Sequence, residues 1–206
     1  EIQLIHIFPD EWRDKKEIIK SIIRNKLGLC SDRIFARKCN IKDIDVKEAN
    51  EFFNNNHIAG KTRCKKSFGL YFDNELVAAI SYRFPFQKKK YPNYIEIARF
   101  ATKLNTRVIG AFGKLLKGSF PWLREEKIEN ILSYADLRFG SGKVYDSLNF
   151  SPLGKTGLDY WYTNGISRFN RFKFRARKPL TEKQVAAAQG VWKIFGCGNK
   201  KYYYKI

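Results

Sequence analysis

The sequence predicts an α/β fold, with α+β character, in which helices pack on a mixed β-sheet. Between residues 94 and 153, an apolar strand pattern, an amphipathic helix pattern and a second strand pattern follow one another. A strand, a crossover helix and a second strand form a unit whose strands are normally parallel. Earlier in the chain, two alternating apolar runs flank Asp73 and Asn74, which predicts an antiparallel hairpin. A sheet that contains both connections is mixed.

The N-terminal part of the chain predicts two short strands and one helix. Residues 3–8 are apolar and are expected to form a strand that Pro9 ends. A helix is expected over 13–27, because acidic residues precede it, isoleucines give it an apolar face and a glycine follows it. Residues 34–36 are expected to form the second strand.

A further helix is expected over residues 45–54, with Asp45 as its N-cap. Helical spacing places four apolar residues on its inner face: Val46, Ala49, Phe52 and Phe53. The hairpin follows, with strands expected over 68–72 and 75–82. The segment 83–94 contains two prolines and three consecutive lysines, so it is expected to be a loop.

The central unit is expected to consist of a strand over 95–100, a helix over 108–120 and a strand over 131–134. The apolar stripe that predicts the helix contains Val108, Phe112, Leu115, Leu116 and Phe120. A turn and a short helix are expected over 140–148. Residues 158–163 alternate and are expected to form the last strand of the sheet.

The composition changes after residue 165. Residues 166–206 contain eleven Lys or Arg and one acidic residue. Basic and apolar residues alternate over 168–178, which predicts an extended basic ribbon with Phe172 and Phe174 on one face. A short helix over 182–189 and a hairpin-like end are expected to complete a small basic module.

The charge of the chain predicts nucleic acid as its partner. Forty Lys and Arg against twenty Asp and Glu give a net charge of +20, in a chain with 16% aromatic residues. A basic, folded chain of this kind favours a nucleic acid over a membrane surface, for which a long basic amphipathic helix would be expected. The sequence contains no apolar run long enough for a transmembrane helix, so no membrane partner is expected.

Four cysteines are spaced widely and irregularly, which indicates reduced, buried thiols in a cytoplasmic protein. No two cysteines are separated by two residues, and the chain has only two histidines. A metal site is therefore not expected.

The central unit carries a resemblance to known proteins. Its order of elements, with a glycine-bearing turn at 107–110 and a Tyr-x-x-Leu-Asn-Phe segment, is similar to the GNAT acyltransferase fold. Residues 134–145 contain Tyr-Ala-Asp-x-Arg-Phe-Gly and then Gly-x-x-Tyr, which resembles the phage DNA-modification family Mom, a GNAT relative. This resemblance implies a GNAT-like mixed sheet over about 45–163 and an acyl-cofactor-dependent enzyme that modifies DNA.

A second resemblance covers nearly the whole chain. Residues 99–116 contain Arg-Phe, Lys-Leu-Asn-Thr, Val, Gly and Lys-Leu-Leu at spacings that resemble phage and intron homing endonucleases of the Vsr-like (EDxHD) group. Residues 3–17 are similar to the last strand and helix of the nuclease in that group. The resemblance implies that the catalytic residues precede Glu1, in a nuclease domain that would use a divalent metal such as Mg²⁺. It also implies a location in the cytoplasm of a bacterial or phage-infected cell.

Three parts are predicted on this basis: a nuclease tail over 1–30, a GNAT-like domain over 31–165 and the basic module over 166–206. The main hypothesis is that the chain binds double-stranded DNA as the target-recognition part of a site-specific homing endonuclease, and that it cleaves no DNA alone. Two alternatives stay open, namely a GNAT- or Mom-like DNA-modifying enzyme and a non-catalytic nucleic-acid-binding protein.

The GNAT resemblance also implies a phosphate-binding turn before the crossover helix. The family pattern is Arg or Gln, two residues, Gly, one residue, and then Gly or Ala. Arg107 and Gly110 match this pattern, but Phe112 stands at the last position, where a bulky side chain would crowd a phosphate. Acyl-coenzyme A is therefore not expected to bind, and the turn would either hold a DNA phosphate or only allow close packing.

Asp136 and His57 are the candidates for catalysis. Asp136 stands at a strand end and is either the acid–base group of the Mom-like motif, a salt-bridge partner of Arg138 or a cap for the next helix. His57 follows a helix, and the alternative to a chemical role is a structural one at the helix terminus.

The predicted DNA contacts are basic residues of the loop, the crossover helix, the following turn and the ribbon. They are Lys88, Lys89, Lys90, Lys103, Arg107, Lys114, Arg138, Lys143, Arg168, Arg171, Lys173, Arg175, Arg177 and Lys178.

Overall fold

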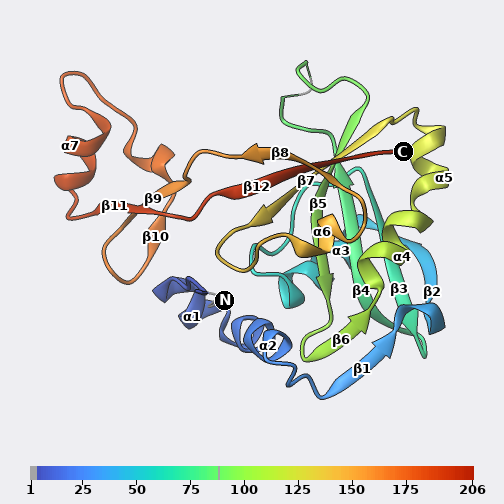
Figure 1. Cartoon of the computed structure of the whole chain (residues 1–206). Coiled ribbons are helices and arrows are strands. Elements are labelled where there is room, and N and C mark those ends of the chain that lie inside the picture. The colour runs from blue at the N-terminus through green and yellow to red at the C-terminus, as the bar shows by residue number, and fades with distance from the viewer. Residues whose placement is uncertain (1–3, 88) are drawn as a thin grey trace.

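The computed structural model describes residues 4–87 and 89–206 and contains a seven-stranded mixed sheet (Figure 1). The strand order is β2-β3-β4-β5-β7-β12-β8. The strands are β2 (Asn40–Ile44), β3 (Lys66–Phe72), β4 (Glu75–Arg83), β5 (Tyr94–Thr102), β7 (Asn130–Asp136), β12 (Asn199–Lys205) and β8 (Ser151–Lys155). Only β5 and β7 pair in parallel, and the other neighbours are antiparallel. The predicted mixed α/β fold is confirmed.

Helices cover both faces of this sheet. The crossover from β5 to β7 contains α4 (Ala111–Gly118) and α5 (Phe120–Glu125), and α3 (Val46–Asn56) lies on the other face. Neighbouring residues of β4 show the division, because Ala78 and Ile80 join the cluster of α4, whereas Ala79 joins the cluster of α3. We call the two sides the α4 face and the α3 face.

Two local predictions are confirmed in detail. Asp45 caps α3, and its carboxylate accepts the backbone N–H of Glu48 at 2.8 Å. Asp73 and Asn74 have positive φ angles of 48° and 64°, as a two-residue hairpin turn requires. Val46, however, is 52% exposed, so its predicted inward position is wrong.

The N-terminal part differs from the prediction. Residues 4–8 form no strand, and residue 3 lies outside the described residues. The expected helix over 13–27 is two helices, α1 (Pro9–Asp14) and α2 (Lys16–Lys26), because Lys15 leaves helical geometry. The predicted strand at 34–36 exists as β1 (Asp32–Phe35), and the 3₁₀ turn η1 (Ala36–Lys38) follows it.

The predicted helix over 108–120 is also corrected. Residues Thr106–Ile109 form the strand β6, which pairs in parallel with β1, so Val108 is a buried strand residue. Gly110 adopts a left-handed conformation, with φ 79°, and α4 begins after it. The helix ends at Gly118, and Pro121 lies at the start of α5.

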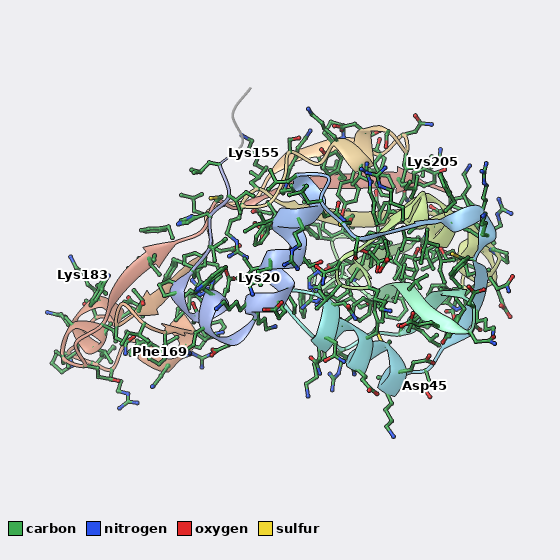
Figure 2. The ribbon with its side chains drawn as sticks, turned by 90° about the horizontal axis from the view of Figure 1, so that it is seen from below. Lys20, Asp45, Lys155, Phe169, Lys183 and Lys205 are labelled. Atoms are coloured by element: carbon green, nitrogen blue, oxygen red, sulfur yellow. The ribbon has the colours of Figure 1, made fainter. Side chains whose placement is uncertain are left out.

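A second sheet lies beyond the main one and contains β9 (Tyr160–Thr163), β10 (Arg168–Phe169) and β11 (Trp192–Phe195). With the 3₁₀ helix η2 (Arg171–Phe174) and the helix α7 (Glu182–Ala187), these strands form what we call the small module. Figure 1 shows this module at one end of the molecule, and Figure 2 shows Phe169 and Lys183 far from Asp45 of α3.

The small module corrects three expectations. Residues 158–163 do not form the last strand of the main sheet, because β9 pairs with β10 and β11. The basic ribbon is extended only at β10, since Asn170 caps η2 and turns the chain. The C-terminal strand β12 forms no hairpin with β11, because it pairs with β7 and β8. The division into 1–30, 31–165 and 166–206 stays a prediction, and residues of its last part complete the main sheet.

Candidate functional site

The parallel strands β5 and β7 separate soon after they begin. They pair only over three residues of each strand, from Tyr94 to Glu96 on β5. The register between β4 and β5 shifts at the same point, so that Ala98 is an extra residue on β5. Arg99 follows it, and its guanidinium donates to the carbonyl oxygens of Ala98 at 2.7 Å and Gly60 at 3.0 Å. Divergence and bulge together distinguish this part of the sheet from its regular neighbours.

Polar side chains gather on the α3 face around this divergence. Strand register places Arg83 beside Glu96, Ser81 beside Arg99, and Tyr134 beside Lys201. Alternation puts these residues on the face opposite α4. We call the following six residues the polar cluster: Arg83, Tyr91, Glu96, Arg99, Tyr134 and Lys201.

Glu96 is the buried acid of the polar cluster. Its carboxylate accepts the Nε–H of Arg83 at 3.0 Å and a second N–H of the same guanidinium. Burial lowers the pKa of Arg99, and the nearby charge of Arg83 lowers it further, whereas Glu96 opposes this effect. The side-chain hydroxyl of Ser81 is buried and has no partner among the described residues. A buried polar atom without a partner is unusual in a folded protein.

Tyr91 and Lys201 form the other half of the cluster. The amino group of Lys201 donates to the Tyr91 hydroxyl and lies 4.1 Å from the centre of its ring. This hydrogen bond and the lysine charge lower the pKa of Tyr91. Burial raises the pKa of Tyr134, and the charges of Glu96 and Tyr91 raise it further. The cluster thus holds two groups that can accept a proton, Glu96 and Tyr91, among cations that attract an anionic ligand.

His57 lies beside this cluster but is held in the neutral form. Burial lowers its pKa to about 3, and the charges of Arg99 and Lys15 act in the same direction. Its Nδ1 accepts the backbone N–H of Ala59 at 3.0 Å, which places the proton on Nε2. His57 therefore stabilises the loop after α3, and its free ring nitrogen can only donate.

Asp136 belongs to an ion-pair network rather than to the polar cluster. Its carboxylate accepts the backbone N–H of Arg138 at 2.9 Å and the guanidinium of the same residue at 2.9 Å. Arg138 also pairs with Glu11 of α1 at 2.8 Å, and Glu11 pairs with Arg168 of β10 at 2.8 Å. The network joins α1, the main sheet and the small module.

The predicted DNA contacts fall into two groups. The structure gives internal partners to Arg138 and Arg168, and also to Lys114, which donates to the carbonyl oxygens of Ala36 and Cys39. These internal partners do not test their prediction as DNA contacts, which stays a prediction. Lys88 lies outside the described residues, and Lys103 pairs with Glu75 at 2.5 Å. The others stay predictions: Lys89, Lys90, Arg107, Lys143, Arg171, Lys173, Arg175, Arg177 and Lys178.

Aromatic rings fill the α4 side of the divergence. Phe112 contacts Phe100, with ring centres 4.9 Å apart, and Tyr145 at 5.4 Å. Tyr145 contacts Phe150 at 5.3 Å and stacks on Tyr202 at 4.7 Å. We call these five residues the aromatic wedge. Phe112 is 5% exposed, so its ring points into the core and not over the turn at Gly110.

The residues at this point do not fit the acyl-coenzyme A site that the GNAT fold implies. The turn that would hold the phosphates is the strand β6, whose backbone is paired with β1. A groove of about 720 Å³ runs along α4, but Phe35, Ile41 and Ile109 line it, and Lys114 is engaged elsewhere. Weak binding of acyl-coenzyme A stays a prediction, for these reasons rather than for crowding by Phe112.

Sequence reasoning missed the polar cluster, although one signal was present. Glu96 and Arg99 interrupt an otherwise apolar strand, and a charged residue in a buried strand needs a partner. The partner residues come from positions 83–201, which no local motif connects. Within residues 4–87 and 89–206, no three His, Cys, Asp or Glu residues converge as a metal site would require. No helix in that part of the chain is long and apolar enough to span a membrane.

Comparisons with known proteins identify relatives. A family model, the Mom protein family, matches residues 38–195. No curated protein sequence matches the chain. A candidate acetyltransferase from Acinetobacter baylyi has a similar structure, with a TM-score of 0.51 and 12% identity over 82% of this chain and 93% of that chain. An IAA acetyltransferase from Bacillus cereus aligns with a TM-score of 0.48 and 10% identity over 82% and 99%. At such identities the similarity shows the fold alone, which is that of GNAT-like acetyltransferases.

Proposed function

This chain belongs to the Mom protein family, and on that premise we propose that it is an enzyme that modifies DNA by transferring an acyl group to a base. The family match carries the proposal, because it spans the strands β4, β5 and β7 that hold most of the polar cluster. The net charge of +20 supports DNA as the substrate. The expected location in the cytoplasm of a bacterial or phage-infected cell stays a prediction.

The polar cluster offers the groups that such a transfer needs. An amine of the base forms a bond to the acyl carbon, the bond from that carbon to its carrier breaks, and the carrier leaves with the electron pair. The amine loses one proton, and Glu96 or Tyr91 is placed to accept it. Arg83, Arg99 and Lys201 place positive charge near the phosphates of the DNA backbone.

The test is to express the chain in bacteria and measure the nucleosides of plasmid DNA by mass spectrometry. We expect a nucleoside of increased mass in DNA from cells with the wild-type chain. Glu96→Gln should reduce its amount at least about 100-fold, the scale of a lost acid–base group. This design does not require knowledge of the acyl donor.

Glu129→Gln is the matched control, since Glu129 accepts from Asn93 at 3.2 Å outside the polar cluster. It should leave the amount of modified nucleoside unchanged. Unmodified DNA from cells that contain folded wild-type chain contradicts the proposal. Equal modification by Glu96→Gln and wild type removes Glu96 from the mechanism.

The homing-endonuclease role is the second candidate. The observation that favours it is that residues 1–37 lie outside the family match, whereas the resemblance to that group includes residues 3–17. We expect the present chain alone to leave plasmid DNA intact in the presence of Mg²⁺. Nicking that persists through purification and responds to substitution of Glu11 or Asp136 contradicts this expectation.

A further inference from the structure

The small module contains a pocket that the proposed reaction does not use. It has a volume of about 380 Å³ and lies between β9, the residues before β9 and the start of η2. This volume is near the lower end of the roughly 300–1,000 Å³ that small-molecule sites occupy, which suits one nucleotide but not a duplex. The lining residues are Leu158, Asp159, Tyr160, Trp161, Asn170, Arg171 and Phe172.

The walls of this pocket are flat and fixed in place. The guanidinium of Arg171 lies over the rings of Tyr160 and Phe172, 5.2 Å from the centre of each, and donates to the Tyr160 hydroxyl at 3.1 Å. The Tyr160 hydroxyl donates to Glu182 of α7 at 2.9 Å. Unstacked bases bind to aromatic rings and to guanidinium planes of this kind.

Phe172 is held at the surface although its neighbour Phe174 is buried. Phe172 is 56% exposed and Phe174 is 1% exposed. The Asn170 side chain accepts the backbone N–H of Phe172 at 2.9 Å, which stabilises the first turn of η2. Arg175 lies 4.7 Å from the centre of the same ring. An exposed aromatic ring near two arginine guanidinium groups offers a surface on which a base can stack, and it is not a core residue.

The pocket also offers groups for the edge of a base. Asp159 presents a carboxylate, which accepts from Asn199 at 3.4 Å and can accept a base amino group. The oxygen of Asn170 is engaged by Phe172, so its amide N–H groups are what it offers to a ligand. We infer that this pocket binds one unpaired nucleobase of the DNA, at a site separate from the polar cluster. The inference rests on the proposed function in one respect, that DNA is the ligand.

The experiment uses two short duplexes that contain 2-aminopurine, one with this base paired and one with it in a single-base bulge. Binding is measured by anisotropy, and stacking is measured by quenching of the 2-aminopurine fluorescence. We expect the wild-type chain to bind the bulged duplex about 5-fold or more tightly than the paired one, with quenching. Phe172→Ala should abolish this preference and the quenching but keep the affinity for the paired duplex. Arg171→Gln should reduce both the preference for the bulged duplex and the affinity for the paired duplex.

Trp192→Ala is the matched control, because Trp192 is also 56% exposed in the small module but does not line the pocket. It should retain the preference and the quenching. Equal affinity of the wild-type chain for the two duplexes overturns the inference, as does a Phe172→Ala variant that keeps the preference. Both results leave DNA binding intact, so they do not touch the proposed function. Failure to bind either duplex removes DNA as the ligand and overturns both this inference and the proposed function.

Discussion

Two regions of this chain are rich in aromatic residues, and they differ in what surrounds the rings. In the aromatic wedge, Phe112 is 5% exposed and contacts other rings on several sides. In the small module, Phe172 is 56% exposed and lies between two arginine guanidinium groups. The same residue type therefore stabilises the sheet in one region and presents a stacking surface in the other.

The two rings stand in different local structures. Phe112 stands in a helix whose residues Leu115 and Leu116 share its buried face. Phe172 stands between Arg171 and Lys173 in a short 3₁₀ turn, where one aromatic ring can enter the small core and the next cannot. Neither aromatic content nor charged neighbours alone thus distinguish a core from a binding surface, because Phe174 stands between Lys173 and Arg175 and is 1% exposed.

The largest expected effect tests this contrast directly. Phe112→Ala should lower the free energy of unfolding by about 4 kcal/mol, because it leaves a cavity among packed rings. Phe172→Ala should lower it by less than about 0.5 kcal/mol. Urea denaturation of the two variants checks both values. Similar losses in the two variants would show that Phe172 belongs to the folded core.

The next effect concerns the network that joins the two regions. Burial alone would raise the pKa of Glu11, but the hydrogen bonds from Arg138 and Phe8 and the charges of Arg138 and Arg168 lower it overall. Glu11→Gln should lower the free energy of unfolding by about 3 kcal/mol. The substitution leaves the largely buried guanidinium groups of Arg138 and Arg168 without this carboxylate partner. Glu17→Gln, at an exposed pair with Lys20, is the control. Urea denaturation measures the free energy of unfolding of both variants. A small and equal loss in Glu11→Gln and Glu17→Gln would contradict a role for the network.

A smaller effect depends on pH. The pKa of His57 is lowered to about 3 in the folded chain, from an ordinary value of 6.5. Between these values the unfolded chain binds a proton that the folded chain does not, so stability falls as the pH falls from about 6.5 towards 3. At pH 5 the loss is about 2 kcal/mol. Thermal unfolding of wild type and His57→Gln should show this part of the pH dependence only in wild type, and parallel curves would contradict it.

A still smaller effect is expected for acetyl-coenzyme A. The backbone of β6 in the predicted phosphate turn is paired with β1, so calorimetry should detect no binding at micromolar concentrations. A micromolar titration that Gly110→Trp abolishes would show that the turn before α4 does hold phosphates.

Local elements of this fold could be predicted from the sequence because local chemistry determines them. Asp45 caps α3 through its own side chain, and Asp73 and Asn74 both tolerate positive φ. The strand β6 could not be predicted, because Val108 continues the spacing of the apolar stripe of α4 while its backbone pairs with β1, more than seventy residues earlier. Pairing with this distant strand therefore determined the conformation of Val108, although the helical spacing includes it.

The candidate site shows the same limit. Glu96 and Arg99 stand out as charged residues in a buried strand, but Lys201 reaches Tyr134 only because β12 inserts between β7 and β8. The prediction of an extended basic ribbon was wrong for a local reason, since Asn170 caps a 3₁₀ helix instead of continuing the strand. The segment is basic, as its sequence shows, but its predicted extended conformation was wrong beyond Phe169.

The central claim is that this chain acts on DNA, and a salt series of duplex binding tests it most directly. Fluorescence anisotropy of the wild-type chain should show a strong salt dependence, to which each phosphate contact contributes roughly one unit of slope. Replacing Arg171, Lys173, Arg175 and Arg177 with Ala should reduce the slope by about two to four, with the fold intact by circular dichroism. Weak binding that does not change with salt would contradict the claim. An unchanged slope in the quadruple variant would move the phosphate contacts away from the small module, to residues such as Lys89, Lys90 and Arg107.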